Sequence, residues 1–156
     1  MMTASTISLL YSARGTANAL SRLPSGKLCD IIRPKKLLLV AYAISSMFYL
    51  IVPNLKFFHL LAILMAIHGI AWGARVVSDQ TIASEILEPE VRGLGSAFLG
   101  TMFSIGRFSG SLLAGIFATL MPVSKVIRLF GIMPAIGSLV ILLLVQEEDT
   151  KAKTPQ

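Results

Sequence analysis

The polar stretch at residues 22–36 reads Arg22-Leu23-Pro24-Ser25-Gly26-Lys27-Leu28-Cys29-Asp30-Ile31-Ile32-Arg33-Pro34-Lys35-Lys36 and lies between two apolar segments. Arg22, Gly26 and Asp30 are spaced four residues apart, so a helix that continues this far places them on one face, where Gly26 lets another backbone come close. Pro34 is unfavourable inside a helix but suits the first turn of a new one. The stretch therefore predicts a helix that ends after Asp30, and then a short basic turn, Arg33 to Lys36, that leads into the next helix.

The composition of the chain is that of a membrane protein. Hydrophobic residues make up 54% of the 156 residues and charged residues only 14%, far from the usual balance of a soluble domain. The formal net charge is +6, but the basic residues lie in the loops between apolar segments rather than in a stripe with aromatic residues, so we expect no nucleic-acid partner. The fold class predicted is an all-α polytopic membrane protein.

Five apolar segments are long enough to cross a bilayer. The first contains Arg14, Asn18 and many Ser and Thr residues, so it needs neighbouring helices to cover its polar face. The tail, residues 146–156, is charged and lacks aromatic residues, which predicts a disordered cytoplasmic segment. The predicted transmembrane domain is 1–145, with spans at about 4–24, 37–53, 57–82, 94–120 and 126–145.

The basic residues of the loops predict the orientation of the chain. On one side of the membrane the predicted spans place Arg22, Lys27, Arg33, Lys35, Lys36, Arg92, Lys151 and Lys153. On the other side they place Lys56, Lys125 and Arg128. Because Lys and Arg in short loops favour the cytoplasmic side, we expect the carboxyl terminus inside the cell.

The pattern Gly26-x-Leu28-Cys29-Asp30-x-x-x-x-Lys35-Lys36, with Arg22 four residues before it, resembles the signature loop of the major facilitator superfamily. That loop follows Gly-x-Leu-small-Asp-Arg-x-Gly-Arg-Lys or Arg, between the second and third helices and in a weaker copy between the eighth and ninth. This chain departs from it at Ile31, Arg33 and Pro34, which fits the weaker copy better. A Gly-rich segment from Gly69 that passes into Pro89-x-x-Arg92-Gly93 is similar to a second feature of that family.

The resemblance covers nearly the whole chain and implies what it does. Five spans followed by a short polar tail match helices eight to twelve, the carboxyl-terminal half of such a carrier. It implies secondary-active transport of a small solute by alternating access, in which two six-helix halves rock about a midplane site. The expected surroundings are the lipid bilayer of the plasma membrane, a small-molecule substrate, and the missing half of a carrier or a second copy of this chain. The alternative is a non-transporting membrane interaction protein, such as a remnant half that packs against a full-length carrier.

Several polar residues inside the spans are candidates for a substrate pathway. Arg107 falls near the middle of the fourth span, where an arginine costs about 2.5 to 3.5 kcal/mol on insertion scales, so it should face a cavity. A structural ion pair or a displaced span boundary would also explain it, and the excess of arginine leans towards an anionic substrate. One face of the third span carries His68, Trp72, Arg75 and Asp79, and the first span carries Arg14 and Asn18. Arg75 and Asp79 are placed to pair. For His68, a neutral hydrogen-bonded residue and a proton-coupling residue are both open.

Charged residues of opposite sign share the predicted cytoplasmic side. Glu85, Glu88 and Glu90, next to Arg92, face the same compartment as the basic turn of Arg33, Lys35 and Lys36. They could form a charge latch that closes in one transport state, or they are two solvated loops; exposed pairs contribute only about 0 to 1 kcal/mol each. With one Cys and two His the sequence offers no metal spacing, and it contains no catalytic constellation or cofactor motif, so we expect neither a metal nor a cofactor nor an enzyme.

Overall fold

The computed structural model describes residues 3–144, which form five long α-helices and two short 3₁₀ helices. Their bounds in chain order are α1 Ala4–Ile31, α2 Pro34–Ile51, η1 Val52–Asn54, α3 Phe58–Ile86, η2 Pro89–Val91, α4 Arg92–Leu120 and α5 Val123–Leu144. In the described part of the chain the structure is therefore all-helical. The predicted disordered tail at 146–156 lies outside the described residues.

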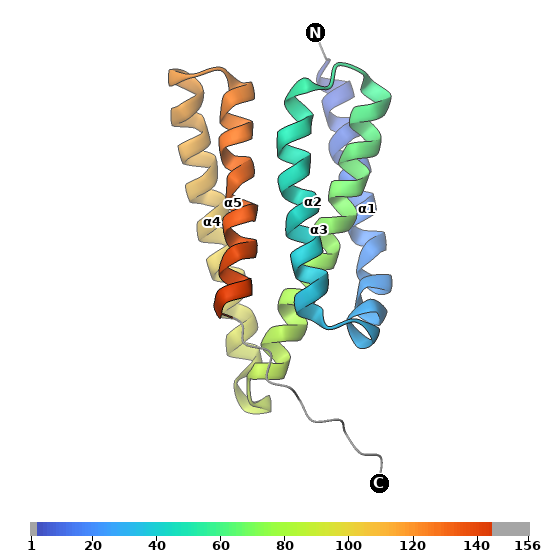
Figure 1. Ribbon diagram of the computed structural model, residues 1–156, viewed down its shortest axis with the longest axis vertical. Helices are drawn as coiled ribbons and strands as arrows, with labels where there is room; N and C mark the ends of the chain where they lie inside the picture. Colours follow the sequence, from blue (N-terminus) through green and yellow to red (C-terminus); the bar gives the residue numbers. More distant parts are fainter. Residues whose placement is uncertain (1–2, 145–156) are drawn as a thin grey trace.

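The five helices run up and down side by side (Figure 1). The α1–α2 and α3–α4 turns lie at one end of the bundle, and the α2–α3 and α4–α5 turns lie at the other. Helix α3 packs most closely on α1, and α2 lies between α3 and α5, whereas α4 makes few contacts with α3 and α5. Helices α1, α2 and α3 thus form a tight group, and α4 forms a loosely attached wall.

Proline residues fix where three of the helices or their leading turns begin. Pro34 is the first residue of α2, Pro89 opens η2 ahead of α4, and Pro122 accepts at its carbonyl the backbone N–H of Lys125 at 2.8 Å in the first turn of α5. The predicted limits differ accordingly. Helix α3 extends to Ile86, beyond the predicted end of its span at 82, whereas α4 begins at Arg92 and α5 at Val123, ahead of the predicted starts at 94 and 126.

Four of the helical segments are long and apolar enough to cross a membrane: Pro34–Asn54, Phe58–Ile86, Pro89–Leu120 and Val123–Leu143. Helix α1 is long enough, with 28 residues, but its apolar run is interrupted by polar and charged side chains. Its most buried side chains include Ser21 and Ser25, which face the other helices. α1 therefore hides polar groups inside the bundle, as a segment with few apolar residues must do in lipid.

Helix α1 packs against α3 through small residues. Cys29 Sγ lies 3.7 Å from Ser78 Oγ, and Ser21 Oγ donates hydrogen bonds to the carbonyls of Asn18 at 2.9 Å and Ile70 at 3.4 Å. On α3, a Cβ added at Gly73 would lie 2.8 Å from the backbone oxygen of Asn18 and closer still to Ser21 Oγ. This glycine is required because it lets the two backbones approach closely.

The expectation that Gly26 admits another backbone is wrong for this structure. No atom beyond its own helix lies within 4 Å of a Cβ built on Gly26. The face that packs on α3 is the neighbouring one, with Ser21, Ser25 and Cys29 buried. Arg22 and Asp30 are exposed, because the face that they share with Gly26 is turned away from α3.

Candidate functional site

A cavity of about 580 Å³, hereafter the central cavity, lies among α2, α3, α4 and α5. Three of the predicted pathway residues on α3, His68, Trp72 and Arg75, line it, and Arg107 of α4 lines it from across. Residues at i, i+4 and i+7 share one face of a helix, which explains why the three α3 side chains meet the same space. The structure thus brings together four of the seven predicted pathway residues.

The guanidinium of Arg75 is surrounded by aromatic rings from three helices. Its Cζ lies 4.6 Å from the ring centre of Tyr42 on α2, 5.0 Å from that of Trp72 on α3, and 5.2 Å from that of Phe103 on α4. Each distance is within the range of a cation–π attraction, which strengthens where water is excluded. The rings therefore hold a positive charge at the wall of the central cavity.

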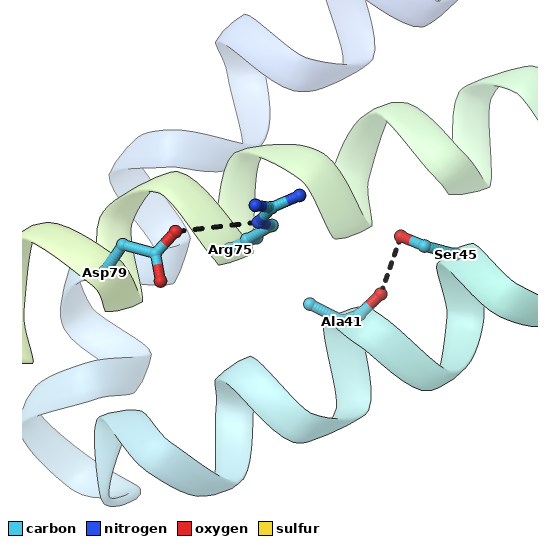
Figure 2. Close-up of polar contacts among 4 residues, drawn as sticks. All are labelled: Ala41, Ser45, Arg75 and Asp79. Atoms are coloured by element: carbon cyan, nitrogen blue, oxygen red, sulfur yellow. Dashed lines mark hydrogen bonds and ion pairs between the residues drawn. The ribbon is translucent and has the colours of Figure 1, made fainter. Parts of the chain in front are cut away.

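Arg75 also pairs with Asp79, one turn further along α3. Arg75 Nε lies 3.6 Å from Asp79 Oδ2, and the two side chains are 20% and 17% exposed (Figure 2). On α2, opposite this pair, Ser45 donates its hydroxyl to the Ala41 carbonyl at 2.8 Å (Figure 2). Within residues 3–144 no hydrogen bond is formed by the terminal Nη groups of Arg75, so they retain donors for another group.

His68 is buried, with only 1% of its surface exposed. Its ring stacks on Phe48 with centroids 4.0 Å apart and meets the edge of Tyr49 at 5.5 Å. In the described part of the chain neither ring nitrogen has a hydrogen-bond partner. Among the described residues His68 is thus surrounded by aromatic rings and has no hydrogen-bond partner, and a role in proton coupling stays a prediction.

Arg107 is exposed on α4 and forms no ion pair with any described residue. Its helix has no buried residue. The nearby glycines Gly106 and Gly110 have no atom from another helix within 4 Å of an added Cβ. The face of α4 that carries these small residues is therefore open in this chain.

A second cavity, of about 720 Å³, lies towards the α3–α4 turn. Tyr42 and Leu99 line both cavities, so the two are neighbours, and Asp79 lines only the second. Most of its remaining wall is aliphatic, with residues such as Ile82, Leu94 and Ile141. It offers few polar groups to orient a ligand, so the central cavity is the better candidate site.

Arg14 and Asn18 are not among the lining residues of either cavity. The Cζ atom of Arg14 lies 5.4 Å from the centre of the Trp72 ring, and Asn18 Oδ1 accepts a hydrogen bond from Arg22 Nε at 3.2 Å. The structure does not bring these two residues to the central cavity, because α1 packs on a different side of α3, and their part in a substrate pathway stays a prediction. Arg14 nevertheless touches the site through Trp72.

The two turns of the predicted latch lie at the same end of the bundle (Figure 1). Glu85, Glu88 and Glu90 are exposed and form no ion pair with any residue in the described range. Arg92 instead donates from Nε to the Leu87 carbonyl at 3.3 Å. The acidic half of the latch is therefore not engaged with the described basic residues in this conformation.

Sequence reasoning missed the aromatic residues that enclose the site. Tyr42 and Tyr49 of α2, Phe103 of α4 and Phe130 of α5 all line the central cavity. The two tyrosines are seven residues apart on one helical face, a spacing that could have identified them. Phe103 lies four residues before Arg107 on the same face of α4, a spacing that could have identified it, whereas the segment of α5 around Phe130 gives no comparable signal.

Long apolar helices that enclose a cavity with arginine side chains are the architecture of a polytopic membrane protein that handles a polar solute. The chain belongs to the Major Facilitator Superfamily, whose family model matches residues 1–156. No curated protein matches the chain. It is thus a multi-pass membrane protein of a transporter family, in contact with lipid and with a substrate, and not an enzyme.

Proposed function

We propose that this chain carries a small organic anion across the membrane by alternating access. The observation that carries the proposal is that Arg75 and Arg107 line one cavity between apolar helices. Asp79 is paired with Arg75, so one positive charge remains without a partner among the described residues of the site. A bound anion would balance it.

Energetics support an anion in this position. A central arginine costs about 2.5 to 3.5 kcal/mol on insertion scales, so such residues usually face a cavity or a counter-charge. Arg75 has a carboxylate and three rings around it, whereas Arg107 has only the cavity. Arg107 is therefore the residue whose presence a substrate best explains.

We further propose that the chain acts as the carboxyl-terminal half, helices eight to twelve, with α1 as the fifth spanning helix of a transmembrane domain at residues 1–145. The departures of Ile31, Arg33 and Pro34 from the stricter signature loop support this half. The open small-residue face of α4 supports a further helical partner, which is either the other half of a carrier or a second copy.

The excess of loop Lys and Arg at the end with the α1–α2 and α3–α4 turns supports a cytoplasmic location for that end, in the plasma membrane. In this arrangement Glu85, Glu88 and Glu90 lie at the same end as the basic turn. They would close the latch only in another state of the transport cycle. Such a latch would bias two conformations without locking either.

The experiment that tests transport is uptake of radiolabelled small anions, with neutral sugars as a comparison, into liposomes that contain the purified chain. We expect uptake of an anion to be lost in Arg107→Ala and retained in Lys125→Ala. The second variant removes an exposed cation from the first turn of α5, next to the α4–α5 turn. If the wild-type chain inserts in the membrane but moves nothing, it is not an autonomous carrier. The chain would then be either a half that needs its partner for transport or a non-transporting protein that packs against a complete carrier.

A further inference from the structure

Aromatic rings make up a large part of the wall of the central cavity. Its lining includes the rings of Tyr42, Tyr49, His68, Trp72, Phe103 and Phe130, which come from all four helices that surround it. Aromatic faces and edges pair favourably with the ring of a ligand, beyond the gain from the area that is buried. The lining therefore favours a flat, unsaturated ligand over an aliphatic one of the same size.

The charges of the cavity point to a single negative charge on that ligand. Arg75 shares its charge with Asp79, and Arg107 has no counter-charge among the described residues. The aromatic rings near Arg75 leave its Nη edges without acceptors. A planar guanidinium edge matches a carboxylate with two parallel hydrogen bonds.

One further polar group in the lining has no partner. His68 is 1% exposed, it faces the central cavity, and both ring nitrogens lack a hydrogen-bond partner within the described range. Because both nitrogens are covered by protein atoms, His68 contributes to the wall of the cavity and not a hydrogen bond to the ligand.

From the aromatic rings and the surplus arginine we propose that the central cavity binds an aromatic monocarboxylate. Transport of this ligand rests on the proposed function, whereas its binding does not. The volume of about 580 Å³ falls within the usual range of small-molecule sites, and it leaves room for a substituted ring. The carboxylate would meet Arg107 and the Nη edge of Arg75, with the ring among Trp72 and Phe103.

Trp72 provides a direct readout, because it is the only tryptophan in the chain and it lines the cavity. The purified chain in lipid nanodiscs is titrated with benzoate and with 4-hydroxybenzoate, and Trp72 emission is followed. The matched probes are cyclohexanecarboxylate, which keeps the charge but loses the aromatic ring, and methyl benzoate, which keeps the ring but loses the charge. We expect saturable binding of the two aromatic anions, and binding at least ten times weaker for both matched probes.

Two variants locate the binding. Arg107→Gln should weaken benzoate binding about tenfold or more, since a charge-assisted contact is lost, whereas Lys125→Gln should leave it unchanged. Phe103→Leu should weaken benzoate about three- to tenfold and leave cyclohexanecarboxylate unchanged. Arg107 and Phe103 both lie on the loosely packed α4, and circular dichroism checks that each variant remains helical.

The proposal is overturned if cyclohexanecarboxylate binds as well as benzoate, or if the folded chain shows no saturable response to either aromatic anion. Uptake measurements distinguish this failure from that of transport. An aliphatic anion that is taken up while benzoate does not bind would leave the transport proposal intact and remove the aromatic one. If benzoate binds but no anion is taken up, the aromatic binding site stands and the transport proposal fails.

Discussion

Substitution of Gly73 by alanine should separate α1 from α3. The new Cβ would lie 2.8 Å from the Asn18 carbonyl oxygen, where ordinary contact begins at 3.4 Å, and it would collide with Ser21 Oγ. The carbonyl is backbone, so α1 itself must shift, and Ser21 must give up the positions from which it donates to Asn18 and Ile70. Overpacking of this kind costs about 1 to 3 kcal/mol, and a lost hydrogen bond costs about 1 kcal/mol.

The gain in helix propensity from glycine to alanine offsets about 1 kcal/mol of this loss. The net weakening of the α1–α3 contact is then about 2 kcal/mol, which corresponds to about a thirtyfold larger population of the separated state. Gly15→Ala on α1 is the matched control, because nothing from outside its helix lies within 4 Å of the added Cβ. It should be neutral or slightly stabilising.

The assay uses Cys29, the only cysteine of the chain, which is 8% exposed and lies against Ser78 of α3. A maleimide reaches its thiol only when α1 moves away from α3, so the labelling rate reports the separated population. We expect Gly73→Ala to label about thirty times faster than the wild-type chain and Gly15→Ala to label at the wild-type rate. Equal rates for all three would refute the close backbone contact between α1 and α3.

Two further predictions concern the contacts that surround the cavity. Gly131→Ala should loosen α5 from α2, because its Cβ would lie 2.7 Å from Tyr49 Cβ. The melting temperature in detergent should fall for this variant. It should not fall for Gly100→Ala, whose added Cβ meets no neighbour within 4 Å. Asp79→Asn should destabilise the chain by about 1 to 2 kcal/mol, less than the loss of a fully buried partner, because the pair is partly exposed. If the two residues are coupled, Arg75→Gln combined with Asp79→Asn costs less than the sum of the single changes, and strict additivity in the melts would exclude coupling.

The helices themselves could be predicted from local sequence. A chain in lipid must satisfy its backbone hydrogen bonds within each segment, so a long apolar run has to be helical. Proline then fixes the starts of the helices, as Pro34 does for α2. These features depend only on neighbours in the sequence.

The packed face of α1 could not be predicted in this way. Arg22, Gly26 and Asp30 form one stripe, and Ser21, Ser25 and Cys29 form another, displaced by a single residue. Both contain small residues, so both are compatible with a close neighbour. The choice depends on where α3 presents Gly69 and Gly73, which is a property of the folded bundle and not of α1.

The residues of the candidate site could also be predicted only in part. His68, Trp72 and Arg75 follow from helical spacing on one segment, and the structure places them in one cavity. Phe103 and Arg107 come from α4, and their position opposite Arg75 requires the arrangement of four helices. Spacing on a single helix identifies one wall of a site, but not the wall that faces it.

The difference in packing between these two walls bears on how a carrier of this shape would work. Arg75 lies on α3, which is held tightly to α1 through the glycine contacts, whereas Arg107 lies on α4, which has no buried residue. An anion between the two arginines would attract both, and the loosely attached wall is the one that can move. Closure of the central cavity would then come from α4 approaching α3, with binding energy supplied by the ligand. Removal of Arg107 should abolish this closure even if Arg75 still binds the anion, so the variant would lose uptake more severely than it loses affinity.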